Sequence, residues 1–235
     1  MKEHPILFSP PMVNAILEGR KTQTRRVVKD IEPDTKWRIG QMGEIVCKHP
    51  NRGKFGVFIH IDDDTFPQCD LIPCPFGKPS DRLWVRETWA DVNTPDGPAI
   101  CYRADGNYMH WRDFSKTFGP DYGIGPSMDY TAYPGDYCMW WEDLLNGAPD
   151  HRWRPSIFMP RWASRITLEI TGIRVERLQD ITEDDALAEG VNGDEGPYDQ
   201  QTPKMCFESL WDSINGKRFP WSSNPFVWVV EFKMV

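Results

Sequence analysis

Residues 19–26 of the chain read GRKTQTRR, one glycine followed by two threonines set among four cationic side chains. The residues before them predict a short helix, because Ser9 can cap its start and a proline fits the first turn, where its missing N–H is not needed. Gly19 can take the left-handed conformation that ends a helix. The octet is therefore a helix end followed by a basic turn whose N–H, hydroxyl and guanidinium groups can converge on an anion or a polarised carbonyl. A solvated basic loop is the alternative interpretation.

One geometric condition applies to this octet. If residues 21–26 formed a straight strand, Lys21 and Thr24 would point to opposite faces, because strand side chains alternate. The two side chains can share a pocket only if the chain turns there, or if a helical turn continues after Gly19.

Short strand-like runs, rich in Val, Ile, Phe and Trp and bounded by Gly, Pro and Asp, predict the fold class. They cover Glu44–Lys48, Gly56–Ile61, Leu83–Ala90, Ser164–Leu178 with a bend at Gly172, and Phe226–Met234. Two further helices are predicted, one over Thr182–Glu189 with a capping box from Thr182 and Asp185 and a stop at Gly190, the other over Met205–Ile214. The pattern predicts a mainly β chain with short helices, of the α+β class, built as a small, partly open β-barrel.

Residues 91–155 have a different composition. They hold seven glycines, seven prolines and twelve of the thirty aromatic residues, with little periodicity. Segments with so many aromatic residues are usually ordered. We interpret this segment as an elaboration inserted between strands of one domain that spans residues 1–235.

Composition limits the class of protein but does not indicate a function. The chain has 235 residues, of which 40% are hydrophobic and 26% are charged, as in an ordinary globular protein. The sequence has no run of eighteen apolar residues, and its start lacks the apolar core of a secretion signal, so neither a membrane span nor export is expected. The six cysteines are expected to be reduced, as in a cytoplasmic protein.

The net charge of −8 arises from one segment. Residues 180–200 hold eight acids and no Lys or Arg, which leaves the rest of the chain neutral. Residues 12–29 carry five cations against one acid, so an anionic or nucleotide ligand is compatible with the overall acidity. The eleven tryptophans indicate a thick core, a stacking surface, or both.

The spacing Gly19-x-Lys21-x-x-Thr24-x-Arg26 resembles the signature of the ASCH domain family, whose fold is PUA-like. The resemblance covers nearly the whole chain, in the same order as in the longer ASCH proteins that are common in phages and prophages. It includes LWVRETW at 83–89, MPRWASR at 159–165, ITEDDALAEG at 181–190 and NPFVW at 224–228.

This resemblance implies an activity. Small bacterial ASCH proteins include amidohydrolases that remove the acetyl group from N4-acetylcytidine with a Lys, a Thr and a Glu. Lys21 and Thr24 match the first two, and aligning the Thr-Glu pair that precedes the family's Glu on Thr182-Glu183 places that residue at Glu189. The resemblance therefore implies Lys21, Thr24 and Glu189 as catalytic residues.

The chemistry of amide hydrolysis suits these residue types. The reaction needs a nucleophile, a base to activate it and a proton donor for the leaving amine. A hydroxyl such as that of Thr24 can be the nucleophile. Lys21 can act as a base if desolvation or neighbouring cations lower its pKa, and Arg20, Arg25 and Arg26 are such neighbours in sequence. Arg26 can also stabilise the developing oxyanion.

Glu189 stands at the end of its predicted helix, where the macrodipole disfavours a negative charge by about 0.3–1 kcal/mol. A residue chosen for helix stability there would be Lys or Arg, so the position favours a functional role. The alternative is an exposed glutamate in an acidic surface run. In either case the sequence predicts that Glu189→Gln slightly raises stability.

A second acid of interest is Glu87. Alternation along residues 84–89 places it on the same face as Val85 and Trp89, where a carboxylate is costly unless it is paired. We expect it to pair with Lys21 or Arg26, or to contact a base edge, as a pocket residue. The predicted substrate contacts are Arg26, Glu87, Arg86, Trp84 and Arg25.

A metal site is not expected. The residues Cys47, His49, Cys69 and Cys74 could supply mixed zinc ligands, but their spacing is loose and no second tight pair completes a ribbon pattern. Buried free cysteines are the favoured interpretation, and no cofactor is expected.

Two functions from different classes remain open at this point. The first is hydrolysis of an N-acyl amide on a modified nucleoside or base, of the N4-acetylcytidine type. The second is a non-catalytic RNA- or DNA-binding module. A closed pocket around a buried lysine would favour catalysis, whereas a flat basic stripe with stacking aromatic residues would favour binding.

Overall fold

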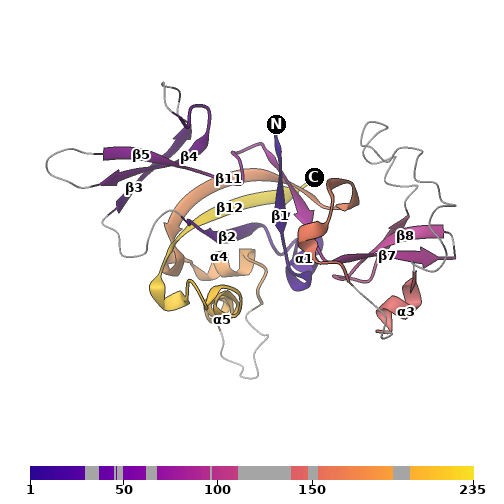
Figure 1. The fold of residues 1–235 in the computed structure, drawn as a ribbon. Helices are drawn as coiled ribbons and strands as arrows, with labels where there is room; N and C mark the ends of the chain where they lie inside the picture. Colours follow the sequence, from indigo (N-terminus) through magenta and orange to yellow (C-terminus); the bar gives the residue numbers. More distant parts are fainter. Residues whose placement is uncertain are drawn as a thin grey trace. The chain divides into compact units, whose positions relative to one another are not determined.

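The computed structural model of the chain describes residues 1–29, 37–44, 46, 50–61, 68–95, 97–110, 139–147, 153–192 and 202–235 (Figure 1). These residues are mainly β, with three sheets and a few short helices. The fold is therefore of the predicted α+β class. None of the helices in this part of the chain has the length and hydrophobicity that a membrane crossing requires.

The chain divides into two compact units. Unit 1 comprises Met1–His4, Ala15–Leu83 and Leu168–Val235, and unit 2 comprises Pro5–Asn14 and Trp84–Thr167. Each unit is described by itself below. That residues 1–235 form a single domain stays a prediction.

The largest sheet has five strands in the order β1-β6-β11-β12-β2. Its strands are β1 (Glu3–Leu7), β6 (Arg82–Arg86), β11 (Thr167–Arg177), β12 (Phe226–Met234) and β2 (Gln23–Val27). Strand β12 pairs antiparallel with both β11 and β2, and a register shift in β11 falls between Ile170 and Gly172. This bulge is the bend that the glycine predicted.

Two smaller sheets complete the β structure. Unit 1 contains β3 (Trp37–Glu44), β4 (Phe55–Ile61) and β5 (Gln68–Pro73) in sequence order, all antiparallel. Unit 2 contains the order β10-β7-β8-β9, made of β10 (Met139–Trp140), β7 (Trp89–Thr94), β8 (Gly97–Tyr102) and β9 (Tyr108–His110). Across the described residues, no sheet closes on itself into a barrel.

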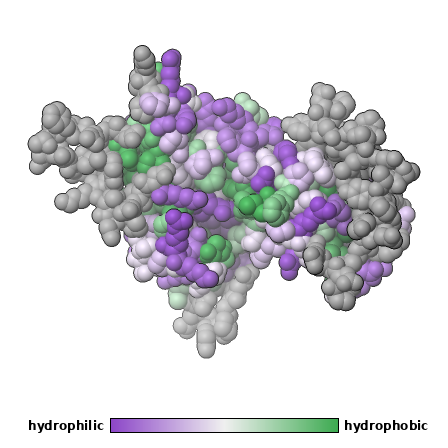
Figure 2. All heavy atoms as spheres, viewed as in Figure 1, coloured by the Kyte–Doolittle hydropathy of each residue, from purple (hydrophilic) through white to green (hydrophobic). Residues whose placement is uncertain are grey.

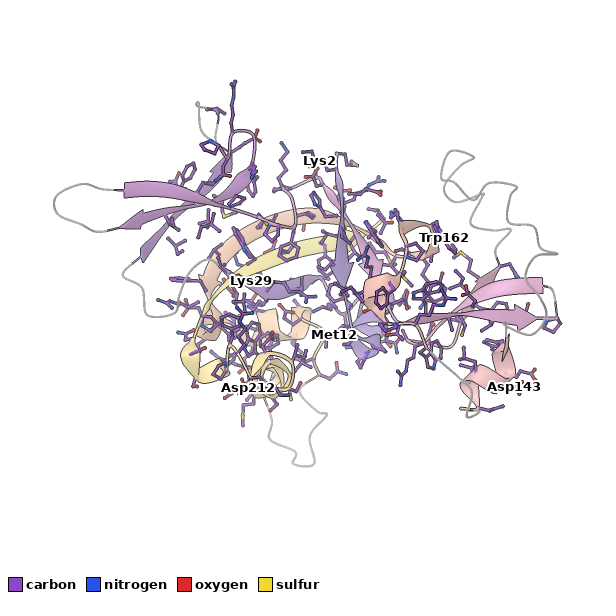
Figure 3. All side chains as sticks on the ribbon, viewed as in Figure 1. Lys2, Met12, Lys29, Asp143, Trp162 and Asp212 are labelled. Carbon is purple, nitrogen blue, oxygen red and sulfur yellow. The ribbon has the colours of Figure 1, made fainter. Side chains whose placement is uncertain are left out.

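The helices of unit 1 cover one face of strands β12 and β2 (Figure 1). Helix α5 (Pro203–Asn215) begins at the Thr202 cap with a proline in its first turn. Its buried Phe207 and Trp211, four residues apart, share one helix face. They pack with the strand residues Val227 and Val229 into one core cluster. In Figure 3, side chains fill the region between Lys29, just after β2, and Asp212 on α5.

Helix α4 (Glu183–Ala188) carries the capping box that its sequence predicts. The backbone N of Asp185 donates to Thr182 Oγ1 at 3.1 Å, and the backbone N of Thr182 donates to Asp185 Oδ2 at 3.3 Å. Gly190, with φ of +90°, then ends the helix as predicted. The other helices are α1 (Pro10–Leu17), α3 (Trp141–Leu145), and the 3₁₀ turns η1 (Ser156–Phe158), η2 (Arg161–Ala163), η3 (Leu178–Asp180) and η4 (Trp221–Ser223).

Unit 2 has its own core, built around the buried aromatic residues Trp89 and Tyr102. The Tyr102 hydroxyl donates to the backbone O of Ala163 at 2.9 Å, so its polar end is satisfied inside the core. Trp162, labelled in Figure 3, lies edge-on to Trp89 with ring centroids 6.4 Å apart.

On the face in Figure 2, the described residues are mostly hydrophilic, with smaller hydrophobic patches between them.

Several predicted elements are confirmed, and two strand predictions are wrong. Strands β12 and β4 and helices α1, α4 and α5 lie where the sequence placed them, within two residues. The run Leu83–Ala90 is not one strand, because it breaks at Glu87 and Thr88 into β6 and β7. The run Glu44–Lys48 is also misplaced, since Glu44 ends β3 and Val46 lies in no strand, while 45 and 47–48 lie outside the described residues. Residues 97–110 and 139–145 of the predicted elaboration form β8, β9, β10 and α3.

The capping box of α4 gives a direct test of this fold. Thr182→Ala removes the hydroxyl that accepts from Asp185, and we expect a loss of about 1 kcal/mol in the free energy of unfolding, the usual value for such a cap. Urea denaturation measures it. Thr202→Ala is the matched control, because its cap bond to Met205 N is longer, at 3.4 Å, and should cost less. Equal unfolding midpoints for wild type and Thr182→Ala would contradict the assignment.

Candidate functional site

The loop that carries Lys21 is fixed through its backbone. The backbone N of Lys21 donates to Ala15 O in α1 at 2.9 Å, and that of Thr22 donates to Ala188 O at the end of α4, also at 2.9 Å. Gly19, with φ of +76°, makes the turn out of α1. Strand β2 begins only at Gln23, so residues 21–26 do not form a straight strand. Lys21 therefore lies outside the alternation of β2, and a pocket that it shares with Thr24 stays a prediction.

Glu189 is placed by the end of α4. It is the C-cap residue, and its backbone N donates to Asp185 O at 2.9 Å. The next residue, Gly190, lies so close to Lys21 that a Cβ atom there would stand 3.0 Å from Lys21 Cβ and 2.8 Å from Ala15 Cβ. A glycine at 190 therefore allows the helix end and the Lys21 loop to meet.

Lys21 and Glu189 form a buried ion pair. Lys21 Nζ donates to Glu189 Oε2 at 2.8 Å and to the backbone O of Glu189 at 2.7 Å. Only 2% of the Lys21 side chain and 4% of the Glu189 side chain are exposed. The predicted approach of Glu189 to Lys21 is confirmed, and the alternative of an exposed surface glutamate is wrong.

The electrostatic surroundings act on the ionisation of Lys21. Burial lowers the pKa of Lys21 below its ordinary 10.5, because water no longer solvates the ammonium group. The carboxylate of Glu189 raises it, whereas the charges of Arg26 and Arg25 lower it further, and the net pKa is lowered. Burial also lowers the pKa of the Arg26 guanidinium, against the opposing effect of Glu189. The predicted desolvated, cation-rich surroundings of Lys21 are thereby confirmed for Arg25 and Arg26.

Arg20, the third predicted cation, has a different setting. It lies on the exposed side of the loop, where its Nη2 atom is 2.5 Å from Glu18 Oε2. Its Nη1 atom donates to the backbone O of Gly190 at 2.8 Å. Arg20 thus stabilises the loop from its solvent-exposed side.

Arg25 is enclosed by carboxylates. Its Nη1 atom donates to Glu189 Oε1 at 3.2 Å, and its Nη2 atom lies 2.5 Å from Glu176 Oε1 and 3.1 Å from Asp185 Oδ2. The side chain is 0% exposed. Arg25 is thus bonded to three carboxylates, and a role that acts through them is inferred below.

Thr24 and Arg26 lie on the other face of β2. Alternation along the strand separates them from Gln23 and Arg25, both of which bond to Asp185. Thr24 is 4% exposed and pairs with Val230 of β12, while Arg26 pairs with Trp228. Lys21, Thr24, Arg26 and Glu189 all belong to unit 1.

The other predicted contacts, Trp84, Arg86 and Glu87, belong to unit 2. The Arg86 guanidinium stacks on the Trp84 ring, 4.5 Å from its centroid. Glu87 is 1% exposed and accepts two hydrogen bonds from Arg165, each of 2.9 Å, from Nε and Nη2. Burial raises the pKa of Glu87, although Arg165 opposes it. The partner of Glu87 in the structure is therefore Arg165, in place of the predicted Lys21 or Arg26.

Sequence reasoning missed several charged residues around the site. Glu176 and Arg174 on β11 and Glu231 on β12 join Arg25 and Asp185 in one charge network. Asp185 was interpreted only as a capping residue. The available signal was its spacing from Glu189, because residues four apart on a helix share a face and two acids there need a cation.

The described residues contain no group of three or more His, Cys, Asp or Glu side chains that could hold a metal ion. Cys74 is a free, buried cysteine, and burial raises its pKa to about 11. Cys47, His49 and the Cys69 side chain lie outside the described residues.

The arrangement in unit 1 can move a proton. A buried amine with a lowered pKa lies in hydrogen-bond contact with a carboxylate, and a hydroxyl and a guanidinium come from the adjoining strand. Comparison of the chain with protein-family models, curated proteins and solved structures finds no match.

The ion pair reverses one expectation about stability. Glu189→Gln leaves Lys21 buried without its carboxylate and removes one of the three carboxylates around Arg25, so we expect the free energy of unfolding to fall by about 3 kcal/mol, where the helix-dipole argument predicted a small rise. Thermal and urea unfolding measure the change. Glu183→Gln in the same helix, at an exposed position, is the control. An increase in stability for Glu189→Gln would contradict the buried pair.

Proposed function

We propose that this chain hydrolyses an N-acyl amide on a modified nucleoside or base, such as an N4-acylated cytosine or cytidine. The observation that carries the proposal is Lys21, which is 4% exposed, has a lowered pKa and bonds to Glu189 at 2.8 Å. A lysine that only attracts phosphate works as a solvated charge, whereas a desolvated lysine with a lowered pKa suits a general base.

Membership of the ASCH family, with its PUA-like barrel, is part of the same proposal. It rests on the octet at 19–26 and on the further stretches that follow in the family's order. Of the three proposed catalytic residues, Thr24 stands on β2 of the five-stranded sheet, Glu189 caps the end of α4, and Lys21 lies in the loop between α1 and β2.

The proposed reaction uses the chain's own side chains. Lys21 takes the proton of the Thr24 hydroxyl as Thr24 Oγ1 attacks the acyl carbonyl carbon. Arg26 stabilises the oxyanion that forms. The proton passes across the hydrogen bond between Lys21 and Glu189 to the leaving nitrogen, the C–N bond breaks, and water then hydrolyses the acyl ester on Thr24. No cofactor takes part in this scheme.

A specific observation favours the second function, nucleic-acid binding, for unit 2. The guanidinium groups of Arg86 and Arg161 lie 4.5 and 5.9 Å from the ring centroid of Trp84, and that of Arg154 lies 4.9 Å from the Trp89 centroid. Phe158 is 71% exposed. Arginines held on aromatic rings beside an exposed aromatic suit single-stranded nucleic acid. Binding of this kind by itself would produce no turnover.

A chromatographic assay of the purified protein tests the proposal. The panel comprises N4-acylated cytosines, cytidines and short oligonucleotides. We expect release of the free amine by wild type and none by Lys21→Arg, because arginine keeps the charge but cannot accept a proton at working pH. Arg20→Lys is the matched control in the exposed part of the same loop and should retain activity. Wild-type turnover by Lys21→Arg would remove Lys21 from any base role.

The pH dependence of kcat is a second test. A base acts in its neutral form, so kcat should rise with pH as Lys21 loses its proton. Because burial lowers the pKa of Lys21, this rise should be centred below the ordinary lysine value of 10.5. Initial rates with saturating substrate at constant ionic strength give the profile. A rise centred at or above 10.5 would mean that a solvated amine, and not Lys21, is the base.

A further inference from the structure

We propose that Arg25 is a positioning residue, which fixes the Glu189 carboxylate so that one of its oxygens faces Lys21. This inference rests on the proposed function and adds to it a residue that touches neither substrate nor the reacting atoms. Two acids stand four residues apart on α4, the two Glu189 oxygens bond to different partners, and Arg25 is enclosed by carboxylates.

The spacing of the acids creates the need for a cation. Asp185 and Glu189 lie four residues apart, so both carboxylates project from the same face of α4. Like charges at this spacing repel each other, and here both are largely removed from water. One guanidinium, that of Arg25, contacts both, at 3.1 Å from Asp185 Oδ2 and 3.2 Å from Glu189 Oε1. Arg25 therefore fixes the positions of the Asp185 and Glu189 carboxylates.

The two oxygens of Glu189 have separate partners. Oε1 accepts from Arg25 at 3.2 Å, and Oε2 accepts from Lys21 at 2.8 Å. A carboxylate held at one oxygen cannot rotate without breaking that bond, so the Arg25 contact fixes the plane of the carboxylate and keeps its other oxygen toward Lys21. The planar fork of arginine can hold several carboxylates at once, which the single ammonium of lysine does less well.

Arg25 is itself held from the side away from Glu189. Glu176 lies 2.5 Å from Arg25 Nη2, and the Phe207 ring centroid lies 6.0 Å from its guanidinium carbon. Arg174 in turn holds the second oxygens of Glu176 and Asp185, at 3.0 and 3.1 Å. The network anchors Arg25 to β11 and α4, and the side chain of Arg25 has no exposed area. It acts on the reaction through Glu189.

The test is Arg25→Lys, which keeps the charge but removes the fork. We expect kcat to fall roughly 10- to 100-fold with little change in KM, the scale of a misplaced catalytic group. A second measurement needs no substrate: NMR titration of the Lys21 side chain gives its pKa. Since the nearby Glu189 carboxylate raises that pKa, its displacement should lower the pKa further in Arg25→Lys than in wild type.

Two variants control for a merely structural role. Arg174→Lys disturbs the same network, but within the described residues Arg174 bonds to Glu176, Asp185 and Glu231 and not to Glu189. It should reduce stability while lowering kcat and the Lys21 pKa less than Arg25→Lys does, because it reaches Glu189 only through other residues of the network. Glu176→Gln loosens Arg25 without touching Glu189 and should shift the Lys21 pKa in the same direction as Arg25→Lys, by less, even if Arg25→Lys fails to fold.

The outcomes separate the two proposals. If Arg25→Lys and Glu176→Gln only lower the melting temperature, with the Lys21 pKa unchanged, Arg25 is a structural residue and the inference is overturned. If wild type cleaves no N-acyl cytosine while the Lys21 pKa still falls further in Arg25→Lys than in Arg174→Lys, the positioning role stands and the proposed function fails.

Discussion

Unit 1 depends on the burial of one carboxylate. Moving the Glu189 side chain out of water costs several kcal/mol, and only well-placed opposite charges offset such a cost. Those charges come from Lys21 in the loop after α1 and from Arg25 in β2. The loop, the strand and the end of α4 must therefore keep fixed positions relative to one another. The backbone hydrogen bonds from Lys21 N to Ala15 O and from Thr22 N to Ala188 O fix these positions.

The same burial affects both the stability of unit 1 and the ionisation of Lys21. A pair in water would leave Lys21 charged and ordinary, whereas here desolvation opposes the charge and Glu189 restores part of it. The charge network behind Arg25 keeps the carboxylate still, so the cost of ordering it is met on folding, before any substrate binds.

Local rules predicted part of this arrangement from the sequence. The capping box of α4, the stops at Gly19 and Gly190 and the bend at Gly172 each depend on a few neighbouring residues, and all are found. The three carboxylates around Arg25 could not be predicted, because they lie 151 to 164 residues away in sequence and meet it only through the packing of β11 and α4 against β2. The break at Glu87 was missed because hydrophobic alternation looks alike in one long strand and in two short ones.

Glu189 shows how a local rule and a tertiary contact compete. At the end of an isolated helix, an acid costs about 0.3–1 kcal/mol through the macrodipole. In the folded chain, losing that acid would leave Lys21 buried without its carboxylate, at a cost of about 3 kcal/mol, so the tertiary contribution is larger and has the opposite sign. When a residue is unfavourable for its own helix but needed by a buried charge network, few other residues are tolerated at that position. Here the restriction falls on the carboxylate that contacts Lys21, where the proposed chemistry requires a group of defined position and ionisation.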